Sequence, residues 1–375
     1  MISHRKYFPN LNGLRFIAAM MVIVFHIEGY KAMLGFENAA SVPAVSVAGP
    51  LGVVLFFVLS GFLITYLLLA EEKSASQINI RNFYLRRILR IWPLYFLILI
   101  LAFAVLPHIS IFTLPGYNKT VIYSDLSSKI LMYLFLLPNL ACAAFTPVPY
   151  ASHLWSIGTE EQFYLLWPVL LKNIKKYRRL LMVVIVAAYL AVAVWLRSHY
   201  AESLPSHDTL LRFWNSFNID CMAIGGIFAL LYFQRSRLLK LLCDSRLFLG
   251  TAALAMLLLS MGCQFRYLHN EIYAVLFGII ILNLATNSSA EKVLEARPLR
   301  YLGRISYGLY MYHPIGIMLA VGICSRAGLS IHWMLYPTAI ALTVIMAAVS
   351  YYGFERRFLN YKRKFRHPAH AGPSD

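Results

Sequence analysis

The sequence predicts an all-α polytopic membrane protein, a bundle of about ten transmembrane helices with both termini in the cytoplasm. Three observations lead to this fold class. Of the 375 residues, 60% are hydrophobic and only 13% are charged, whereas about 25% of a soluble protein is charged. The apolar residues fall into runs close to the roughly 20 residues that a helix needs to cross a bilayer. The basic residues gather in alternate short loops, as the positive-inside rule requires of cytoplasmic segments.

Helices are the expected spanning elements because lipid offers no partner for unpaired backbone groups. The expected spans are residues 11–29, 50–70, 88–107, 159–172, 180–197, 209–233, 247–264, 271–287, 305–324 and 333–353. The first run contains Arg15 and His26, and no small-residue cleavage site follows it. We therefore interpret it as a span and not as a signal peptide. The protein is expected to be a multi-pass protein of the cell membrane, in contact with its lipids.

Residues 130–145 form a further apolar stretch that is short for a crossing and is broken by Pro138 and Asn139. If this stretch crossed, every later loop would change sides and the basic loop at 172–180 would face outward, against the positive-inside rule. We therefore predict a re-entrant or surface segment here. Residues 1–357 are expected to form one membrane domain and residues 358–375 a basic, disordered cytoplasmic tail.

The net charge of +18 does not predict nucleic-acid binding, because the basic residues lie in loops where topology alone accounts for them. The five cysteines stand singly, without CxxC or metal-ligand spacing. Neither a disulfide framework nor a metal site is therefore expected.

The first span carries two ionisable residues, Arg15 and His26, which are eleven residues apart and so project from nearly the same helix face. Their separation along the axis is about 16 Å. Each residue alone has an ordinary interpretation. Arg15 could extend its guanidinium to the lipid headgroups, and His26 could be a hydrogen-bonded histidine at a helix end near the membrane interface. Together they suit a long, thin donor with phosphates at one end and a reactive group at the other, such as an acyl-coenzyme A. Such a donor is a substrate, and no permanently bound cofactor is expected.

Arg86, Arg87 and Arg90 cluster at the start of the third span. They serve either as a positive-inside anchor or as a dock for the phosphates of the coenzyme.

In the fourth span, Glu160 and Glu161 follow Ser156 and Thr159, which can cap a helix and leave both carboxylates in its first turn. The topology places Glu160 on the same outer side as His26. There a carboxylate could fix the imidazole tautomer and leave the other ring nitrogen as a base.

Two later spans contain further polar sets. Ser306, Tyr310 and His313 recur on one face of the ninth span, where an inward packing or hydrogen-bonding role is expected for His313. In the sixth span, Asp220 is expected either to pair with Arg212 or to contact a substrate. Gly225 and Gly226 are expected to permit close helix contact.

These motifs together resemble those of the acyltransferase 3 family of membrane transacylases, over about residues 8–357. The matching segments are LNGLRFIAAMMVIVFH, GVVLFFVLSGFLIT, FYLRRILRIWPLYF, HLWSIGTEEQFYLLWP and ISYGLYMYHPI. The resemblance implies that Arg15 and His26 are essential, that Glu160 belongs to the site, and that acyl-coenzyme A is the cytoplasmic donor. It implies a carbohydrate or glycolipid acceptor in the cell envelope.

Two departures from the family pattern are visible. Asn218 stands where many relatives have an arginine two residues before the aspartate that matches Asp220. Some relatives also have a soluble hydrolase-like domain that completes the transfer outside the membrane, and none is visible in this sequence. The bundle is therefore expected to act alone or with a separate extracytoplasmic partner.

The expected mechanism is direct transfer: His26 removes the proton of an acceptor hydroxyl, which attacks the thioester. The arginines hold the phosphates, while Ser60 or Tyr310 stabilises the oxyanion. A route through an acyl-histidine is the mechanistic alternative. The rival function is a non-enzymatic carrier of a lipid-linked sugar or polysaccharide, in which the same residues form a substrate or proton path.

Overall fold

The computed structural model describes residues 8–286 and 294–365, and among them no β-strand occurs. The longer helices are α1 (Leu11–Met33), α2 (Pro43–Ala75), α3 (Ile80–Ile100), α7 (Trp155–Asn173), α8 (Arg178–Leu196), α9 (His207–Ser216), α10 (Ile219–Phe233), α12 (Ser245–Ser260), α13 (His269–Thr286), α15 (Ser306–Arg326) and α16 (Ile331–Ser350). The shorter ones are α4 (Lys119–Tyr123), α5 (Leu126–Leu134), α6 (Pro138–Ala144), α11 (Leu238–Leu242), α14 (Arg297–Arg304) and α17 (Arg356–Lys362).

Eight helical segments of the described chain are long and apolar enough to cross a membrane. They are Leu11–Met33, Pro43–Ala75, Ile80–His108, Arg178–Leu196, His207–Phe233, His269–Thr286, Ser306–Arg326 and Ile331–Lys362. Two of the ten expected spans fall short of this criterion. The expected span 159–172 lies in α7, which carries Glu160, Glu161 and Lys172, and the expected span 247–264 is the apolar but 16-residue helix α12. The count of ten is thus not confirmed.

Residues 130–145 form no single helix, as predicted. The chain breaks between α5 and α6 at Leu136, which has a positive φ of 60°. The resulting helices of 9 and 7 residues are too short to cross about 30 Å of hydrocarbon. They pack instead against the rest of the protein: Tyr95 of α3 donates a hydrogen bond to the carbonyl of Tyr133 at 2.8 Å.

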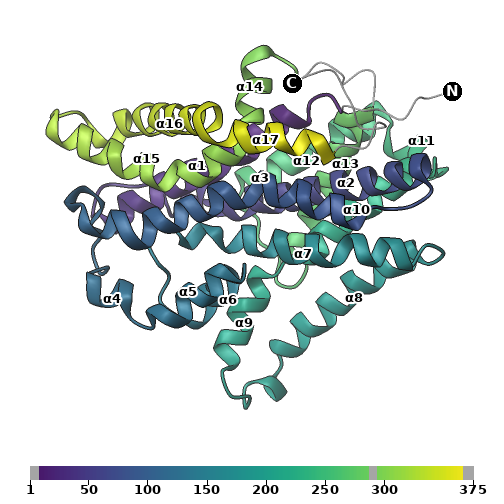
Figure 1. Ribbon diagram of the computed structural model, residues 1–375, viewed down its shortest axis with the longest axis horizontal. Helices are drawn as coiled ribbons and strands as arrows, with labels where there is room; N and C mark the ends of the chain where they lie inside the picture. The colour runs from purple at the N-terminus through teal and green to yellow at the C-terminus, as the bar shows by residue number, and fades with distance from the viewer. Residues whose placement is uncertain (1–7, 287–293, 366–375) are drawn as a thin grey trace.

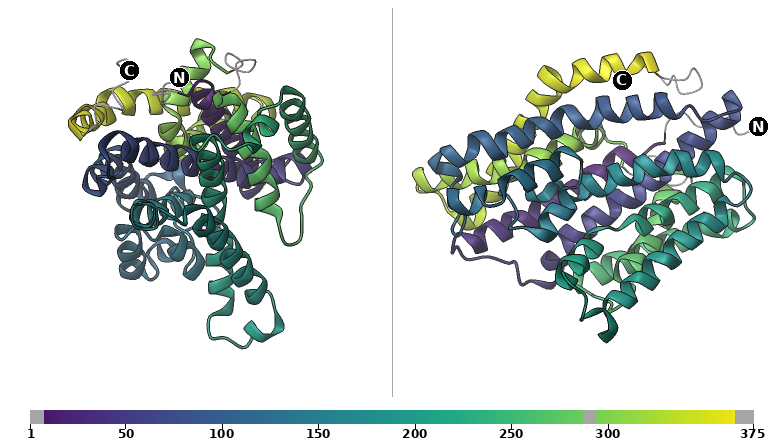
Figure 2. Two further views of the ribbon diagram at one scale, coloured as in Figure 1. Left: turned by 90° about the vertical axis from the view of Figure 1, so that its right-hand side faces the viewer. Right: turned by 60° about the horizontal axis from the view of Figure 1, so that its bottom comes forward.

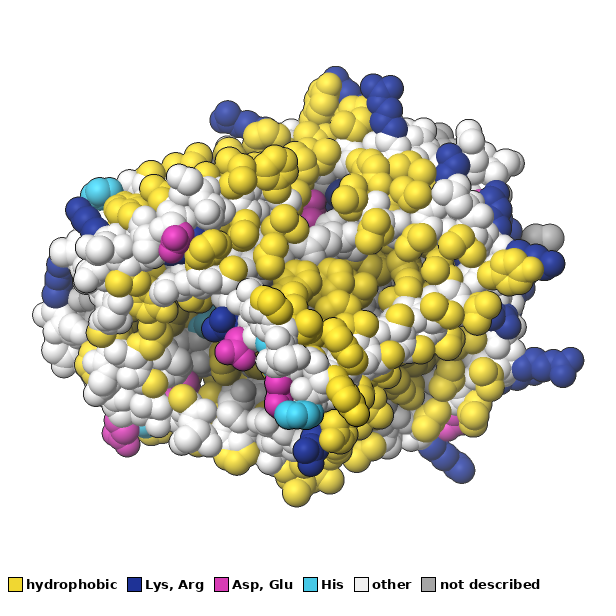
Figure 3. Space-filling view, turned by 90° about the horizontal axis from the view of Figure 1, so that it is seen from below, with side chains coloured by type: hydrophobic (Ala, Val, Ile, Leu, Met, Phe, Trp, Pro, Cys, Tyr) yellow, Lys and Arg dark blue, Asp and Glu magenta, His cyan; other side chains and the backbone are white. Residues whose placement is uncertain are grey.

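The long helices run roughly side by side, while α8 and α9 project from the bundle (Figures 1 and 2). One end of the bundle, which we call the basic end, carries the connections at 71–79, 173–178 and 234–245, at the right of Figure 1. The connections at 34–42 and 326–331 lie at the opposite end. Seen from below, the surface is mainly hydrophobic, and its projecting lysine and arginine side chains gather toward the right (Figure 3).

Helix α2 lies at the centre of the bundle, between α1 and α10. It begins with Pro43 at its first helical position, where a backbone N–H would have no intrahelical partner, so that proline's lack of one costs nothing. A Cβ atom added at Gly225 of α10 would come within 2.1 Å of the Val58 carbonyl oxygen, and one added at Gly61 within 1.9 Å of the Met222 carbonyl oxygen. Glycine therefore sets the α2–α10 spacing, which confirms the expected role of Gly225.

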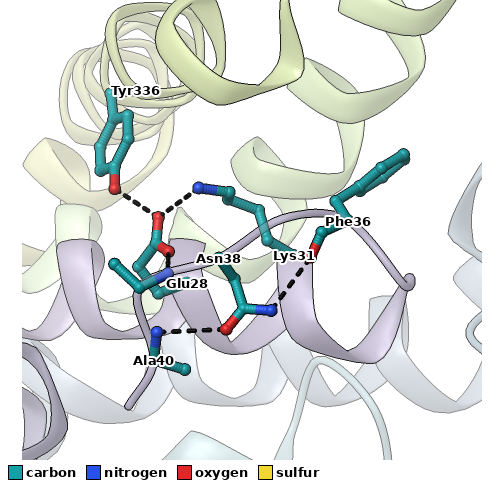
Figure 4. Close-up of polar contacts among 7 residues, drawn as sticks. Glu28, Lys31, Phe36, Asn38, Ala40 and Tyr336 are labelled. Atoms are coloured by element: carbon teal, nitrogen blue, oxygen red, sulfur yellow. Dashed lines mark hydrogen bonds and ion pairs between the residues drawn. The ribbon is translucent and has the colours of Figure 1, made fainter. Parts of the chain in front are cut away.

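At the opposite end, a buried ion pair joins α1 to α16 and to the following loop (Figure 4). Glu28 and Lys31 are fully buried and 2.8 Å apart. Glu28 also accepts hydrogen bonds from the Tyr336 hydroxyl and the Ala39 N–H. Asn38 completes the loop by donating to the Phe36 carbonyl oxygen. These contacts hold the last turns of α1, starting at Glu28, two residues beyond His26.

Helical structure continues beyond residue 357, where the tail was expected to begin. A π-helical turn at Tyr351–Glu355 joins α16 to α17, so a helical segment continues to Lys362 and a 3-10 turn follows at Arg363–Phe365. Residues 366–375 of the expected tail lie outside the described residues.

Candidate functional site

A narrow cavity of about 70 Å³ lies inside the bundle, between α1, α2, α3, α7 and α15. We call it the central cavity. Its walls combine aromatic and apolar side chains with Ser60, Ser156, Glu160 and three arginines, Arg15, Arg87 and Arg90. Five helices thus bring together residues that are up to about 300 positions apart in the sequence, including most of the expected site residues.

Glu160 is held on one side of this cavity by two hydroxyl groups. The Ser60 hydroxyl donates to its Oε1 at 2.7 Å, and the Tyr164 hydroxyl donates to its Oε2 at 3.2 Å. Helix α7 begins at Trp155 with no side-chain cap, so Glu160 lies in its second turn and not in the first. The carboxylate faces the same small space as Arg15 and Arg87, where its charge offsets theirs.

Arg87 is held by stacking, and no described residue forms an ion pair with it. Its guanidinium lies 5.4 Å from the ring centres of both Phe83 and Tyr164, an arrangement in which aromatic faces attract a cation. Its Nε atom is buried and has no hydrogen-bond partner among the described residues. A buried guanidinium with unused donors is costly unless a ligand completes it.

Arg15, Arg90 and Tyr307 also line a second, larger cavity of about 360 Å³ at the basic end. The walls of this cavity, which we call the basic vestibule, further include Arg304, Arg356 and Lys362. The vestibule and the central cavity therefore meet at Arg15 and Arg90. A path lined by basic side chains leads from the end of the bundle to its interior.

Arg86 does not belong to this group, contrary to expectation. Its guanidinium donates to Glu71 Oε2 at 2.9 Å and to the Phe365 carbonyl oxygen at 3.0 Å, and it lines neither cavity. Helical geometry explains the split, because consecutive residues such as Arg86 and Arg87 face different sides of a helix.

One helical turn beyond Tyr310, outside the lining of the central cavity, two histidines contact each other. His313 Nδ1 lies 2.6 Å from the Tyr310 carbonyl oxygen, and His313 Nε2 lies 3.2 Å from His26 Nδ1. A carbonyl oxygen only accepts, so Nδ1 of His313 carries its proton and Nε2 of the neutral ring is an acceptor. His26 Nδ1, which also lies 2.9 Å from the Val22 carbonyl oxygen, must then be the donor. The proton-free nitrogen of a neutral His26 is consequently Nε2.

A third histidine, His153, was not singled out from the sequence, although it begins the HLWS motif. Its ring lies 5.1 Å from that of His313, it is buried, and neither ring nitrogen has a hydrogen-bond partner among the described residues. Burial, together with the neighbouring His26, lowers the pKa of His153 to about 3. Its backbone carbonyl accepts from the Tyr310 hydroxyl at 2.8 Å, so this turn also positions the histidine pair.

The expected contact between Glu160 and His26 is wrong for the described structure. Both Glu160 oxygens accept from hydroxyl groups, and His26 contacts His313 instead. The register of α1 against α2 gives the reason. Gly52 packs against Val22, whereas Ser60, which binds Glu160, lies eight residues farther along α2 toward the basic end. Eight residues of helix correspond to about 12 Å.

The two expected oxyanion donors are engaged elsewhere. The Ser60 hydroxyl donates to Glu160 and the Tyr310 hydroxyl to the His153 carbonyl oxygen. Glu161 points away from the central cavity: its Oε2 accepts from the Trp92 indole N–H at 2.9 Å, and its Oε1 is buried without a partner in the described chain.

Asp220 is fully buried, and no ion pair joins it to Arg212 among the described residues, so that expected pairing is wrong. Its carboxyl group faces that of Glu271 at the start of α13. The exposed Arg212 instead lines a third cavity, which is described below.

Fold and site together define a multi-pass helical membrane protein with an internal, arginine-lined cavity, one wall of which lies a helical turn from a histidine pair. The family model described as an acyltransferase domain, of the acyltransferase 3 family, matches residues 8–354. The chain therefore belongs to this family. No solved structure matches it.

Three curated relatives are similar over nearly the whole chain. Peptidoglycan O-acetyltransferase OatA of Listeria monocytogenes is 27% identical, covering 96% of this chain and 58% of that protein. O-acetyltransferase OatA of Staphylococcus aureus is 25% identical, with 92% and 56% covered. Putative peptidoglycan O-acetyltransferase YrhL of Bacillus subtilis is 28% identical, with 94% and 55% covered. The chain thus spans little more than half the length of these relatives.

Proposed function

We propose that this protein is an O-acetyltransferase that moves an acetyl group from acetyl-coenzyme A onto a hydroxyl of a cell-wall carbohydrate, such as peptidoglycan. The observation that carries the proposal is the path from the basic vestibule, past Arg15 and Arg90, into the central cavity, whose wall includes Tyr310, one helical turn from His313 of the histidine pair. The names of the relatives support the acetyl group and the carbohydrate.

The shape and charge of this path fit an acyl-coenzyme A donor. The vestibule offers several guanidinium groups to phosphates, which arginine binds with paired hydrogen bonds. The central cavity, of about 70 Å³, is too small for a nucleotide, which leaves the slender pantetheine arm as the part of the donor that would enter it. Arg15 and His26 are about 16 Å apart along α1, so the arm would carry the thioester toward the histidine pair. Arg86 is excluded from the donor site by its ion pair with Glu71.

In the proposed reaction, His26 Nε2 accepts the proton of the acceptor hydroxyl while the oxygen attacks the thioester carbonyl. The carbon–sulfur bond then breaks, and the departing coenzyme A thiolate takes the proton from His26. His313 keeps the reactive nitrogen of His26 free through its contact with Nδ1. Glu160 offsets the charge of Arg15 and Arg87 and does not orient the histidine.

The side assignment is part of the proposal. The basic end faces the cytoplasm under the positive-inside rule, so the donor binds from the cytoplasm of a cell membrane. A separate protein on the outer side is an additional proposed partner, which would pass the acetyl group to acceptors beyond the reach of the bundle.

The test uses the purified full chain in lipid nanodiscs with radiolabelled acetyl-coenzyme A and soluble peptidoglycan fragments. Label transferred to the fragments by the wild type and lost in His26→Ala supports the proposal. Thermal stabilisation by acetyl-coenzyme A alone separates it from the carrier function, because a carrier of lipid-linked sugar has no site for that ligand. Absence of both stabilisation and transfer would refute it.

A further inference from the structure

A third cavity, of about 290 Å³, lies toward the end of the bundle opposite the vestibule. It is lined by Pro50, Val53, Val54, Trp155, Arg212, Asn215, Ser216, Asn218 and Asn270. We call it the asparagine pocket. Asn218 and Asn270 stand at the starts of α10 and α13, and Pro50 is near the start of α2. These three helices all begin at the end opposite the vestibule, which places the pocket there.

From this cavity we infer that the asparagine pocket is the subsite for the saccharide acceptor. The inference rests on the proposed function and extends it by placing the second substrate. The pocket's volume is near the lower limit for small-molecule sites, which suits one sugar unit of a longer glycan.

The polar groups of the pocket are held in place by one another. Asn218 Oδ1 accepts from Asn270 Nδ2 at 2.8 Å and from the Tyr189 hydroxyl at 3.4 Å, and Asn218 Nδ2 donates to the Asn215 carbonyl oxygen at 3.2 Å. Arg197 Nη2 donates to Asn215 Oδ1 at 2.7 Å. This network fixes the amide groups before any ligand arrives.

The same network leaves both hydrogen-bond donors and a hydrogen-bond acceptor available to a ligand. Within the described chain, the amide N–H groups of Asn215 and the guanidinium of Arg212 make no side-chain hydrogen bond as donors. Asn270 Oδ1 likewise accepts none there. Sugar hydroxyl and N-acetyl groups are both donors and acceptors, so they need such a mixed set. The indole of Trp155 supplies an apolar wall beside it.

The pocket also lies next to the chemistry. Val53 lines both the asparagine pocket and the central cavity, and Trp155 directly precedes Ser156, which lines the central cavity. Gly49 packs against Phe25, and Gly52 against Val22. The part of α2 that borders the pocket is thus at the level of His26, so a hydroxyl of a bound sugar would lie on the histidine side of the cavity.

Two exposed positions on α9, Arg212 and Asn215, provide the test with little risk of unfolding. In the nanodisc assay, Arg212→Gln and Asn215→Ala are compared with Arg326→Gln, an exposed arginine at the same end that lies outside the pocket. We expect Arg212→Gln to raise the KM for soluble peptidoglycan fragments about tenfold, the effect of losing one charge-assisted hydrogen bond. Asn215→Ala should raise it about fivefold, the effect of losing one neutral hydrogen bond. The KM for acetyl-coenzyme A and the stabilisation by it should stay within twofold of wild type, and Arg326→Gln should match wild type in all three.

An acceptor KM within twofold of wild type in both pocket variants, with active wild-type enzyme, would overturn the subsite alone. Equal changes in donor and acceptor KM would also overturn it, because they would show a general distortion. A wild-type protein that is stabilised by acetyl-coenzyme A but transfers to no saccharide would instead refute the proposed function, and the subsite with it.

Discussion

His313 Nε2 and His26 Nδ1 lie 3.2 Å apart, although 287 positions separate them in the sequence. The Tyr310 carbonyl oxygen fixes the proton of His313 on Nδ1, and His313 in turn fixes that of His26. The pair is therefore a directed chain of hydrogen bonds that ends at a free nitrogen on His26.

His313→Ala should lower kcat while leaving the KM for acetyl-coenzyme A unchanged. General-base catalysis is worth about 10²–10⁴-fold, and the loss of the positioning contact should remove part of this factor. His313→Asn, whose amide still offers an acceptor, should recover some activity and show a pH–rate profile closer to wild type. If His313→Ala has the same kcat and the same pH–rate profile as the wild type, His313 contributes only to packing.

Arg87→Ala should weaken acetyl-coenzyme A binding, because its buried guanidinium faces the donor path without a protein partner for Nε. Loss of one charge-assisted contact is worth about 1.5–3 kcal/mol. Arg86→Ala is the matched control, since it removes the neighbouring arginine that is paired with Glu71. Isothermal titration with acetyl-coenzyme A should show weaker binding by Arg87→Ala than by Arg86→Ala. Equal affinities of the two variants would contradict the assignment of Arg87 to the donor site.

Gly225→Ala should destabilise the bundle, because its Cβ would lie 2.1 Å from a backbone oxygen of α2. Overpacking of this kind costs about 1–3 kcal/mol. Gly250→Ala serves as the control, since nothing lies within 4 Å of an added Cβ there. Thermal unfolding in detergent should show a lower midpoint for Gly225→Ala only, and equal midpoints would mean that α2 and α10 separate readily.

A reporter fused after Tyr177 should be active in the cytoplasm, and one inserted near Asn118 should be active outside. Tyr177 lies at the basic end, next to the ion pair between Arg178 and Glu72, whereas Asn118 begins α4 beyond the far end of α3. An outward signal at Tyr177 would reverse the proposed orientation and the side from which the donor binds.

Helix periodicity and the cost of burying charge were sufficient to predict much of this protein. They predicted the helical class and the interruption at 130–145. They also placed Arg15, Arg87 and Arg90 toward one end of the bundle, whereas Glu160, expected on the side of His26, shares the central cavity with these arginines. Such predictions depend on residues within one helix or on the apolar length of a segment, which the sequence contains directly.

Contacts between helices were predicted poorly. The partner of His26 depends on the register of α1 against α15, and that of Arg86 on the packing of α3 against the end of α2. Registers of this kind are set by close contacts such as those at Gly52 and Gly225, which periodicity does not specify. His153 was overlooked because it precedes its helix and lies in no span.

Val53 is the one residue shared by the central cavity and the asparagine pocket, and the pocket shares none with the vestibule. If each cavity takes its proposed substrate, neither substrate blocks the other's path, and the steady-state kinetics should follow random addition. Free coenzyme A should then compete with the donor and inhibit noncompetitively against the sugar. A larger side chain at Val53 should separate the two substrates, so that the donor still binds while transfer stops.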